Sequence, residues 1–201
     1  MTFRVVFRGL LLALAIFVLQ AACCGGGEEL EFEVTNYEFQ AVKGTYSSLA
    51  NKVEFPIGSP EIGSGESVAA AYVGFSFRPD VTYLSMAGGS GMNAYACSPL
   101  PNRPTQLIHR IRIRSTNDFI SDNATIQAGM LLNSVFTNYE NQFVFEDDLV
   151  TGTVPASESG FVLILSEPVA TTQTHAFSFE VTLSDSSKFE LTSHPITITA
   201  N

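Results

Sequence analysis

Apolar and polar residues alternate along most of the chain from Glu31 onward. Alternation with a period of two places apolar side chains on one face of a β-strand. In residues 177–183, for example, phenylalanine, valine and leucine alternate with serine, glutamate and threonine. By this criterion we predict strands at Glu31–Phe39, Val68–Phe77, Val81–Met86, Gln106–Arg114, Gln142–Glu146, Gly160–Ser166, Phe177–Leu183, Phe189–Leu191 and Ile196–Ile198.

Turn residues divide these segments into hairpins. Arg78-Pro79-Asp80 predicts a turn between the second and third strands, and Ser184–Ser187 predicts a turn after Leu183. The continuous apolar run at Gly160–Ser166 is typical of a buried central strand. A helical pattern occurs at Ala128–Phe136, where we expect one short helix. About nine strands and one short helix indicate an all-β, antiparallel, immunoglobulin-like β-sandwich, with a β-barrel as the alternative.

The N-terminal segment has a different pattern. Arg4 and Arg8 precede an apolar run from Leu10 to Leu19, and small residues follow directly before Cys23. A basic start, a short apolar run and small residues are the features of a signal peptide. A membrane-spanning helix needs about 20 apolar residues, so this run is too short for one. We therefore predict a signal peptide at residues 1–22.

Cys23 is the candidate lipidation site. The segment Leu19-Gln20-Ala21-Ala22-Cys23 resembles a lipobox, in which the cysteine thiol takes a diacylglyceryl group before the signal peptide is removed. Residues 23–30, which include three successive glycines, would then form an acylated, flexible tether. Residues 31–201 would form a single β-sandwich domain. The alternative is a cleaved secretory peptide whose cysteines begin an unlipidated mature chain.

Composition limits the partners of the mature chain. Removing residues 1–22 from 201 leaves 179 residues, enough for one domain with its own core. Two of the ten basic residues lie in the signal peptide, so the mature chain has eight basic and twenty acidic residues and a net charge of −12. Such a chain repels nucleic acid, and no nucleic-acid partner is expected.

The sequence has no motif that we can assign to catalysis. Gly88-Gly89-Ser90-Gly91 lacks the spacing and strand-to-helix context of a nucleophile elbow. His109, His175 and His194 are isolated, without the spacing of zinc ligands, and Glu146-Asp147-Asp148 lacks that of a calcium loop. We therefore expect no metal, no cofactor and no enzymatic activity.

Three arginines form the one charged group that stands out. Arg110, Arg112 and Arg114 alternate with apolar residues, so we expect them on one strand face, with Leu107, His109, Ile111 and Ile113 on the other. A row of guanidinium groups can bind carboxylate, sulfate or phosphate groups, such as those of an acidic glycan. The alternative, which we favour, is that the arginines pair with acidic side chains on neighbouring strands.

Several short motifs, taken in order, resemble a family of Bacteroidetes lipoproteins that is defined only as a domain of unknown function. The motifs are Cys23-Cys24-Gly25, Ala96-Cys97-Ser98-Pro99, Asn117-Asp118-Phe119 at the end of the Ile111–Phe119 segment, Asn133-Ser134-Val135-Phe136, and the Phe177–Phe189 hairpin. The resemblance covers nearly the whole mature chain and implies an exported, lipid-anchored β domain. It assigns no activity and no site residues.

These features predict a cell-envelope lipoprotein, held in the outer membrane by its lipid and facing the periplasm or the cell surface. We expect a non-catalytic module that binds a glycan, a peptide or an envelope protein through polar loops at Gly58–Ser67, Gly88–Gly91 and Thr151–Gly160. The alternative is an accessory subunit of an envelope complex, pairing through an exposed edge strand near Ile196.

The two remaining cysteines allow a direct test of the exported state. A disulfide between Cys24 and Cys97 would close a loop of about 70 residues and stabilise the fold by about 2–4 kcal/mol. The bridge predicts that denatured, unreduced mature protein contains no titratable thiol. Two titratable thiols would instead support the alternative, in which both cysteines are free and Cys97 acts as a small apolar residue.

Overall fold

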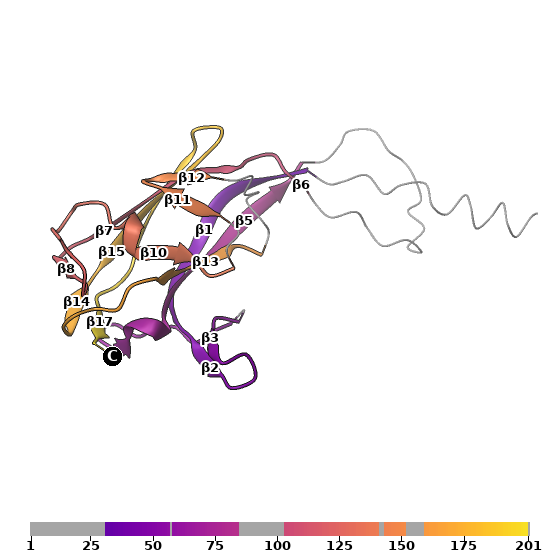
Figure 1. Ribbon diagram of the computed structural model, residues 1–201. Coiled ribbons are helices and arrows are strands. Elements are labelled where there is room, and N and C mark those ends of the chain that lie inside the picture. Colours follow the sequence, from indigo (N-terminus) through magenta and orange to yellow (C-terminus); the bar gives the residue numbers. More distant parts are fainter. Residues whose placement is uncertain (1–30, 57, 85–102, 141–142, 152–158, 201) are drawn as a thin grey trace, which may run out of the picture. The chain divides into compact units, whose positions relative to one another are not determined.

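The computed structural model describes residues 31–56, 58–84, 103–140, 143–151 and 159–200 (Figure 1). The chain forms two compact units, one of Met1–Phe32 with Tyr83–Arg103 and one of Glu33–Thr82 with Pro104–Asn201. In the first unit, the rings of Phe32 and Tyr83 meet edge to face, with centroids 6.3 Å apart.

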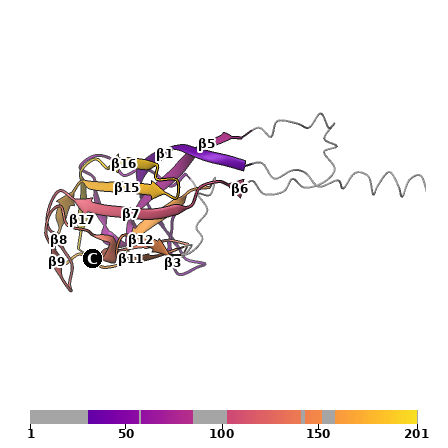
Figure 2. The same ribbon diagram turned by 90° about the horizontal axis from the view of Figure 1, so that it is seen from above.

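Two five-stranded sheets make up most of the second unit. The first sheet, with β13, β5 and β1 side by side in Figure 1, consists in order of β10 (Phe136–Asn138), β13 (Phe161–Leu165), β5 (Val73–Tyr83), β1 (Glu31–Lys43) and β6 (Arg103–Pro104). The second sheet, whose strands β7, β15 and β16 are clear in Figure 2, consists in order of β11 (Val144–Glu146), β12 (Leu149–Thr151), β7 (Ile108–Ser115), β15 (Phe177–Leu183) and β16 (Lys188–Thr192).

Smaller elements surround these sheets. They are a three-stranded sheet of β14 (Gln173–His175), β17 (Ile196–Thr199) and β4 (Ser67–Ala69), the hairpin of β2 (Thr45–Ser47) and β3 (Lys52–Glu54), the hairpin of β8 (Phe119–Ile120) and β9 (Thr125–Ile126), and 3-10 turns at Ala70–Tyr72 and Asn133–Val135. The pairing of β17 with β4 is parallel.

Phenylalanine side chains from the two sheets form the core. The ring of Phe75 on β5 lies 5.1 Å from Phe177 and 5.0 Å from Phe179 on β15, measured between centroids. Phe77 contacts Phe179 edge to face at 5.2 Å and stacks on Phe161 of β13 at 4.6 Å. These contacts join the inner faces of the two sheets, so the predicted all-β, sandwich-like fold is confirmed.

The strongest sequence patterns predict their strands correctly. Phe177 and Phe179 are buried while Ser178 between them is exposed, as the alternation in β15 requires. β15 pairs with β16 across the predicted turn at Ser184–Ser187. The apolar run predicted as a central strand forms β13, which lies between β10 and β5.

The predicted faces of β7 are correct only in part. Ile111 and Ile113 are fully buried, as expected, but His109 and Leu107 are exposed and Ile108 is buried in their place. The pairing between β7 and β15 skips His109, which is the extra residue of a β-bulge. Because side chains alternate with a period of two, one extra residue exchanges the two faces on its N-terminal side.

The short helix predicted at Ala128–Phe136 is wrong, since the structure has only the 3-10 turn at Asn133–Val135 in this segment. Several of its polar groups bond to β7, and only the 3-10 turn has hydrogen bonds within the segment. The backbone N–H of Leu132 donates to the carbonyl of Ile113. The Asn133 side chain donates to the carbonyl of Ile111 at 2.6 Å and accepts from the N–H of Ile113 at 3.1 Å. Tertiary hydrogen bonds therefore replace those of a helix.

The predicted hairpin across Arg78-Pro79-Asp80 is also wrong. The structure divides Val68–Phe77 into β4, a 3-10 turn and the first part of β5, and β5 continues through Pro79 to Tyr83. Proline lacks an N–H donor and is tolerated in a strand where no partner needs that donor. The register between β5 and β13 ends at Phe77, before Pro79, so the proline breaks no bond of that ladder.

The strand near Ile196 is not an edge strand. β17 pairs with β14 on one side and with β4 on the other, so both of its backbone edges are used. The prediction that this strand offers an exposed edge is therefore wrong. The alternation of Ile196 and Ile198 identified the strand but contained no information about its neighbours.

Replacing Phe179 by alanine should destabilise the fold strongly. The side chain is 1% exposed and its ring contacts Phe39, Phe75, Phe77, Phe136 and Phe177. Truncating a buried phenylalanine costs about 3–5 kcal/mol. Urea unfolding of Phe179→Ala, followed by circular dichroism, measures this loss. Leu49→Ala is the control, because Leu49 is fully exposed in the β2–β3 turn; equal losses in the two variants would contradict the packing of the sheets.

Candidate functional site

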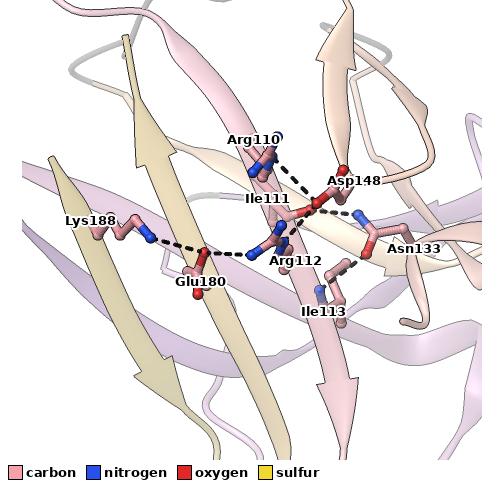
Figure 3. Close-up of polar contacts among 8 residues, drawn as sticks. All are labelled: Arg110, Ile111, Arg112, Ile113, Asn133, Asp148, Glu180 and Lys188. Carbon is pink, nitrogen blue, oxygen red and sulfur yellow. Dashed lines mark hydrogen bonds and ion pairs between the residues drawn. The ribbon is translucent and has the colours of Figure 1, made fainter. Parts of the chain in front are cut away.

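The arginine row lies on the outer face of the second sheet (Figure 3). Arg112 donates a 2.6 Å hydrogen bond from Nε to Asp148 and lies 3.4 Å from Glu180, while Arg110 Nε lies 3.3 Å from the same Asp148 oxygen. Lys188 on β16 approaches Glu180 from the other side, at 3.8 Å. Two of the three arginines are thus paired with acidic side chains, as the favoured alternative predicted.

Asp148 is the acceptor that links these charges. It lies in the tight turn between β11 and β12, where the preceding Asp147 has a positive φ of 57°. The hydrogen bond from Arg112, together with the charges of Arg110 and Arg112, holds the pKa of the Asp148 carboxyl below its usual range. Within the Glu146-Asp147-Asp148 segment, Asp148 therefore forms the ion pairs with β7.

Arg114 differs from the other two arginines. It is half-buried and lies opposite Ser178 of β15, and no carboxylate within the described ranges pairs with it. To bind an anion, a row of arginines must direct several guanidinium groups at that anion. Of the three arginines in the row, only Arg114 has no acidic partner among the described residues, so the row offers one unpaired guanidinium where the anion-binding alternative requires three.

A groove of about 380 Å³ lies on the outer face of the first sheet. Its floor consists of outward-facing residues of β1, β5 and β13, and its walls come from the segment after β3, the end of β10 and the residues just before β13. Pockets of this size accommodate small ligands. The groove is therefore large enough to hold a small ligand.

Phe55 forms an apolar wall of this groove. Its side chain is 6% exposed, and its ring meets Tyr139 edge to face at 5.3 Å. The ring lies directly over Gly74 of β5, where a Cβ atom would come within 2.6 Å of it. Only glycine leaves room for this contact. A side chain at this position would push Phe55 away from the sheet and change the wall.

Polar side chains lie on the floor of the groove. Glu38 and Gln40 come from β1, and Ser76 and Arg78 come from the neighbouring strand β5. Arg78 Nη1 lies 3.9 Å from a Glu38 oxygen, and the two side chains are 73% and 60% exposed. An exposed ion pair at this distance is weak, so both groups remain accessible to a ligand.

Two of the three loops predicted to bind a ligand contribute to the groove. Gly58 and Ser59 come from the loop Gly58–Ser67, and Ser159 and Gly160 come from Thr151–Gly160. The loop Gly88–Gly91 lies outside the described residues, as do Cys23, Cys24 and Cys97. The sequence identified these loops but not the strand residues between them, because outward-facing polar residues of a strand look alike whether they line a groove or face solvent.

The three histidines do not come together, and one of them is part of the core. His175 is fully buried, its ring lies against Phe119 and Phe177, and its Nδ1 is 2.7 Å from the Ser115 hydroxyl. Its Nε2 is buried without a hydrogen-bond partner in the described part of the chain. Burial lowers the pKa of His175 to about 4, because the charged ring would lose its hydration.

Two further observations apply to the described residues alone. No group of three or more histidine, cysteine, aspartate or glutamate side chains there is arranged to hold a metal ion. Nor does that part of the chain contain a helix with the length and apolar character needed to cross a bilayer.

No family model matches the chain, and no curated protein matches it. Among solved structures, it is similar to the C-terminal domain of the AgI/II polypeptide BspA from Streptococcus agalactiae, with a TM-score of 0.28 and 7% sequence identity. The match covers 82% of this chain and 50% of that one, so the chain spans half the length of that structure. A similarity at this TM-score supports no inference about ligand or activity.

We expect the stability of the protein to fall as the pH is lowered from 6.5 towards 4. The pKa of His175 is lower in the folded protein than the ordinary value of 6.5, so between these two values the folded state binds fewer protons than the unfolded state. The stability that this difference contributes above pH 6.5 is therefore lost as the pH falls towards 4. The loss for one such group reaches about 3 kcal/mol. Urea unfolding at several pH values measures it. His175→Gln should flatten the profile, and His109→Gln, which changes an exposed histidine, should not; an unchanged slope in His175→Gln would contradict the assignment.

Proposed function

We propose that the chain is a lipid-anchored protein of the bacterial cell envelope whose β-sandwich binds a ligand without catalysing a reaction. In this proposal residues 1–22 are removed as a signal peptide, acylated Cys23 holds the protein in the outer membrane, and residues 23–30 form the tether. The groove on the outer face of the first sheet receives the ligand, which is a glycan, a peptide or a neighbouring protein.

The anchor is supported by the sequence of the first thirty residues. Two basic residues, a short apolar run and two alanines precede Cys23. Lipids with two or more acyl chains hold a protein stably at a bilayer, so such an anchor would require no membrane-spanning helix. The resemblance to Bacteroidetes lipoproteins of unknown function adds to this reasoning and favours the outer membrane.

The observation that carries the binding function is the groove itself. Its floor lies on three hydrogen-bonded strands, so the side chains at its base are held by a rigid scaffold. Binding sites placed on regular strands are better preorganised than sites on loops alone. The arginine row supports this function less well, because Asp148 and Glu180 already neutralise Arg112 and Arg110.

An accessory subunit of an envelope complex is the second candidate. Strand β17 cannot provide its contact, because both edges of that strand are paired. Strand β16 ends the second sheet and would be the alternative edge. A protein partner that co-purifies from the native membrane in equal amounts would favour this candidate over a free binding module.

The anchor can be tested with the full chain in a bacterial host that has an outer membrane. Cells are fed a clickable palmitate analogue, and the membrane fraction is examined for labelled protein. The wild type and Cys24→Ser should carry the label and sediment with membranes. Cys23→Ser should lose the label. A labelled Cys23→Ser protein, or an unprocessed wild-type chain in the cytosol, would refute lipidation at Cys23.

A further inference from the structure

The donors and acceptors that line the groove restrict the chemistry of its ligand. The Glu38 carboxylate only accepts hydrogen bonds and the Arg78 guanidinium only donates them, whereas Gln40 and Ser76 do both. A cation would leave the guanidinium without a partner, and an anion would meet the carboxylate. A ligand whose groups both donate and accept, as hydroxyl groups do, matches the whole set.

The apolar part of the lining fits the same ligand class. Pro56, which is exposed, and Val162 of β13, which is half-buried, lie beside the polar side chains. A sugar ring has an apolar face of C–H groups and a rim of hydroxyl groups. Such a ring can cover the apolar residues with its face while its hydroxyls reach Glu38, Gln40 and Arg78.

The position of the groove within the sheet disfavours an extended peptide. Peptides that bind to sheets commonly add as a further strand and gain their affinity from main-chain hydrogen bonds at a free edge. The floor of the groove includes β5, which lies between β13 and β1 and therefore has no free edge there. Ligands in this groove must be recognised through side chains.

The charges around the groove favour neutral over acidic saccharides. Among the described residues of the lining, the Glu38 carboxylate and the Arg78 guanidinium carry opposite charges. The guanidinium already lies 3.9 Å from the Glu38 carboxylate. A sulfated or uronic acid residue placed here would meet the Glu38 carboxylate beside the guanidinium, within a chain whose overall charge is negative.

From these observations we infer that the groove binds an uncharged oligosaccharide, with Glu38, Gln40 and Arg78 hydrogen-bonded to its hydroxyl groups. This inference rests on the proposed binding function and names its ligand class. Glu38 accepts from the sugar hydroxyls, Arg78 donates to them, and Pro56 and Val162 contact an apolar ring face.

The full lipidated chain in detergent micelles can be tested on arrays that carry neutral, sulfated and uronic glycans, and on a peptide array. We expect binding to neutral saccharides and weaker or no binding to their acidic analogues. Titration calorimetry with the best neutral ligand then gives dissociation constants. Losing a hydrogen bond to a charged group should raise the dissociation constant about tenfold or more in Glu38→Gln and in Arg78→Gln.

Matched variants on the other sheet control for the loss of a charge. Glu190→Gln removes an exposed carboxylate on β16, and Lys188→Gln removes an exposed ammonium group on the same strand; neither residue lines the groove. Both controls should retain wild-type affinity. Ser76→Trp, which fills the floor of the groove, should abolish binding while thermal unfolding shows that the fold is kept.

The outcomes separate this inference from the proposed function. Peptide binding that Ser76→Trp abolishes would overturn the saccharide assignment and keep the groove as a binding site. Acidic glycans bound in a manner that depends on Arg114 would overturn it in favour of the arginine row. Binding to neither array would overturn both the saccharide and the peptide functions, while palmitate labelling would still report on the anchor.

Discussion

Contact between phenylalanine rings of β5 and β15 is the interaction on which the rest of the structure depends. Phe75 and Phe77 face Phe177 and Phe179, and each of these rings is almost completely buried. Burial of aromatic side chains contributes the largest share of stability in small β proteins. Since strand side chains alternate, fixing these rings inward also fixes the opposite residues outward. The groove on the first sheet and the arginine row on the second sheet both consist of such outward-facing residues, so both follow from the packing of the rings.

The two outer faces use their polar residues differently. On the second sheet, Arg112 lies between Asp148 and Glu180, and the charges are largely satisfied within the protein. On the first sheet, Glu38 and Arg78 form only a distant, exposed pair above a groove. Side chains that already have close partners stabilise local structure, whereas exposed groups with weak partners can exchange them for a ligand at little cost. This contrast favours the groove as the functional face.

Sequence periodicity predicted much of the fold because the core residues alternate regularly in β13, β15 and β17. It failed where tertiary contacts override the local pattern. A bulge at His109 exchanged the faces of β7, and hydrogen bonds from Asn133 to β7 replaced a helix. The groove could not be predicted, because its residues come from distant segments whose register is set by strand pairing. The loops around it were identifiable, since glycine and serine mark turns.

The amide side chain of Asn133 covers backbone groups of β7 that would otherwise lower the solubility of the protein. It bonds to the N–H of Ile113 and the carbonyl of Ile111, which are backbone groups of β7 that a neighbouring strand would otherwise pair. Unpaired backbone groups along a strand are templates on which another molecule can add and start an aggregate. Together with the N–H of Leu132, which bonds to the Ile113 carbonyl, this side chain covers a stretch of β7 that the short strand β12, which pairs with β7 at a single position, leaves open.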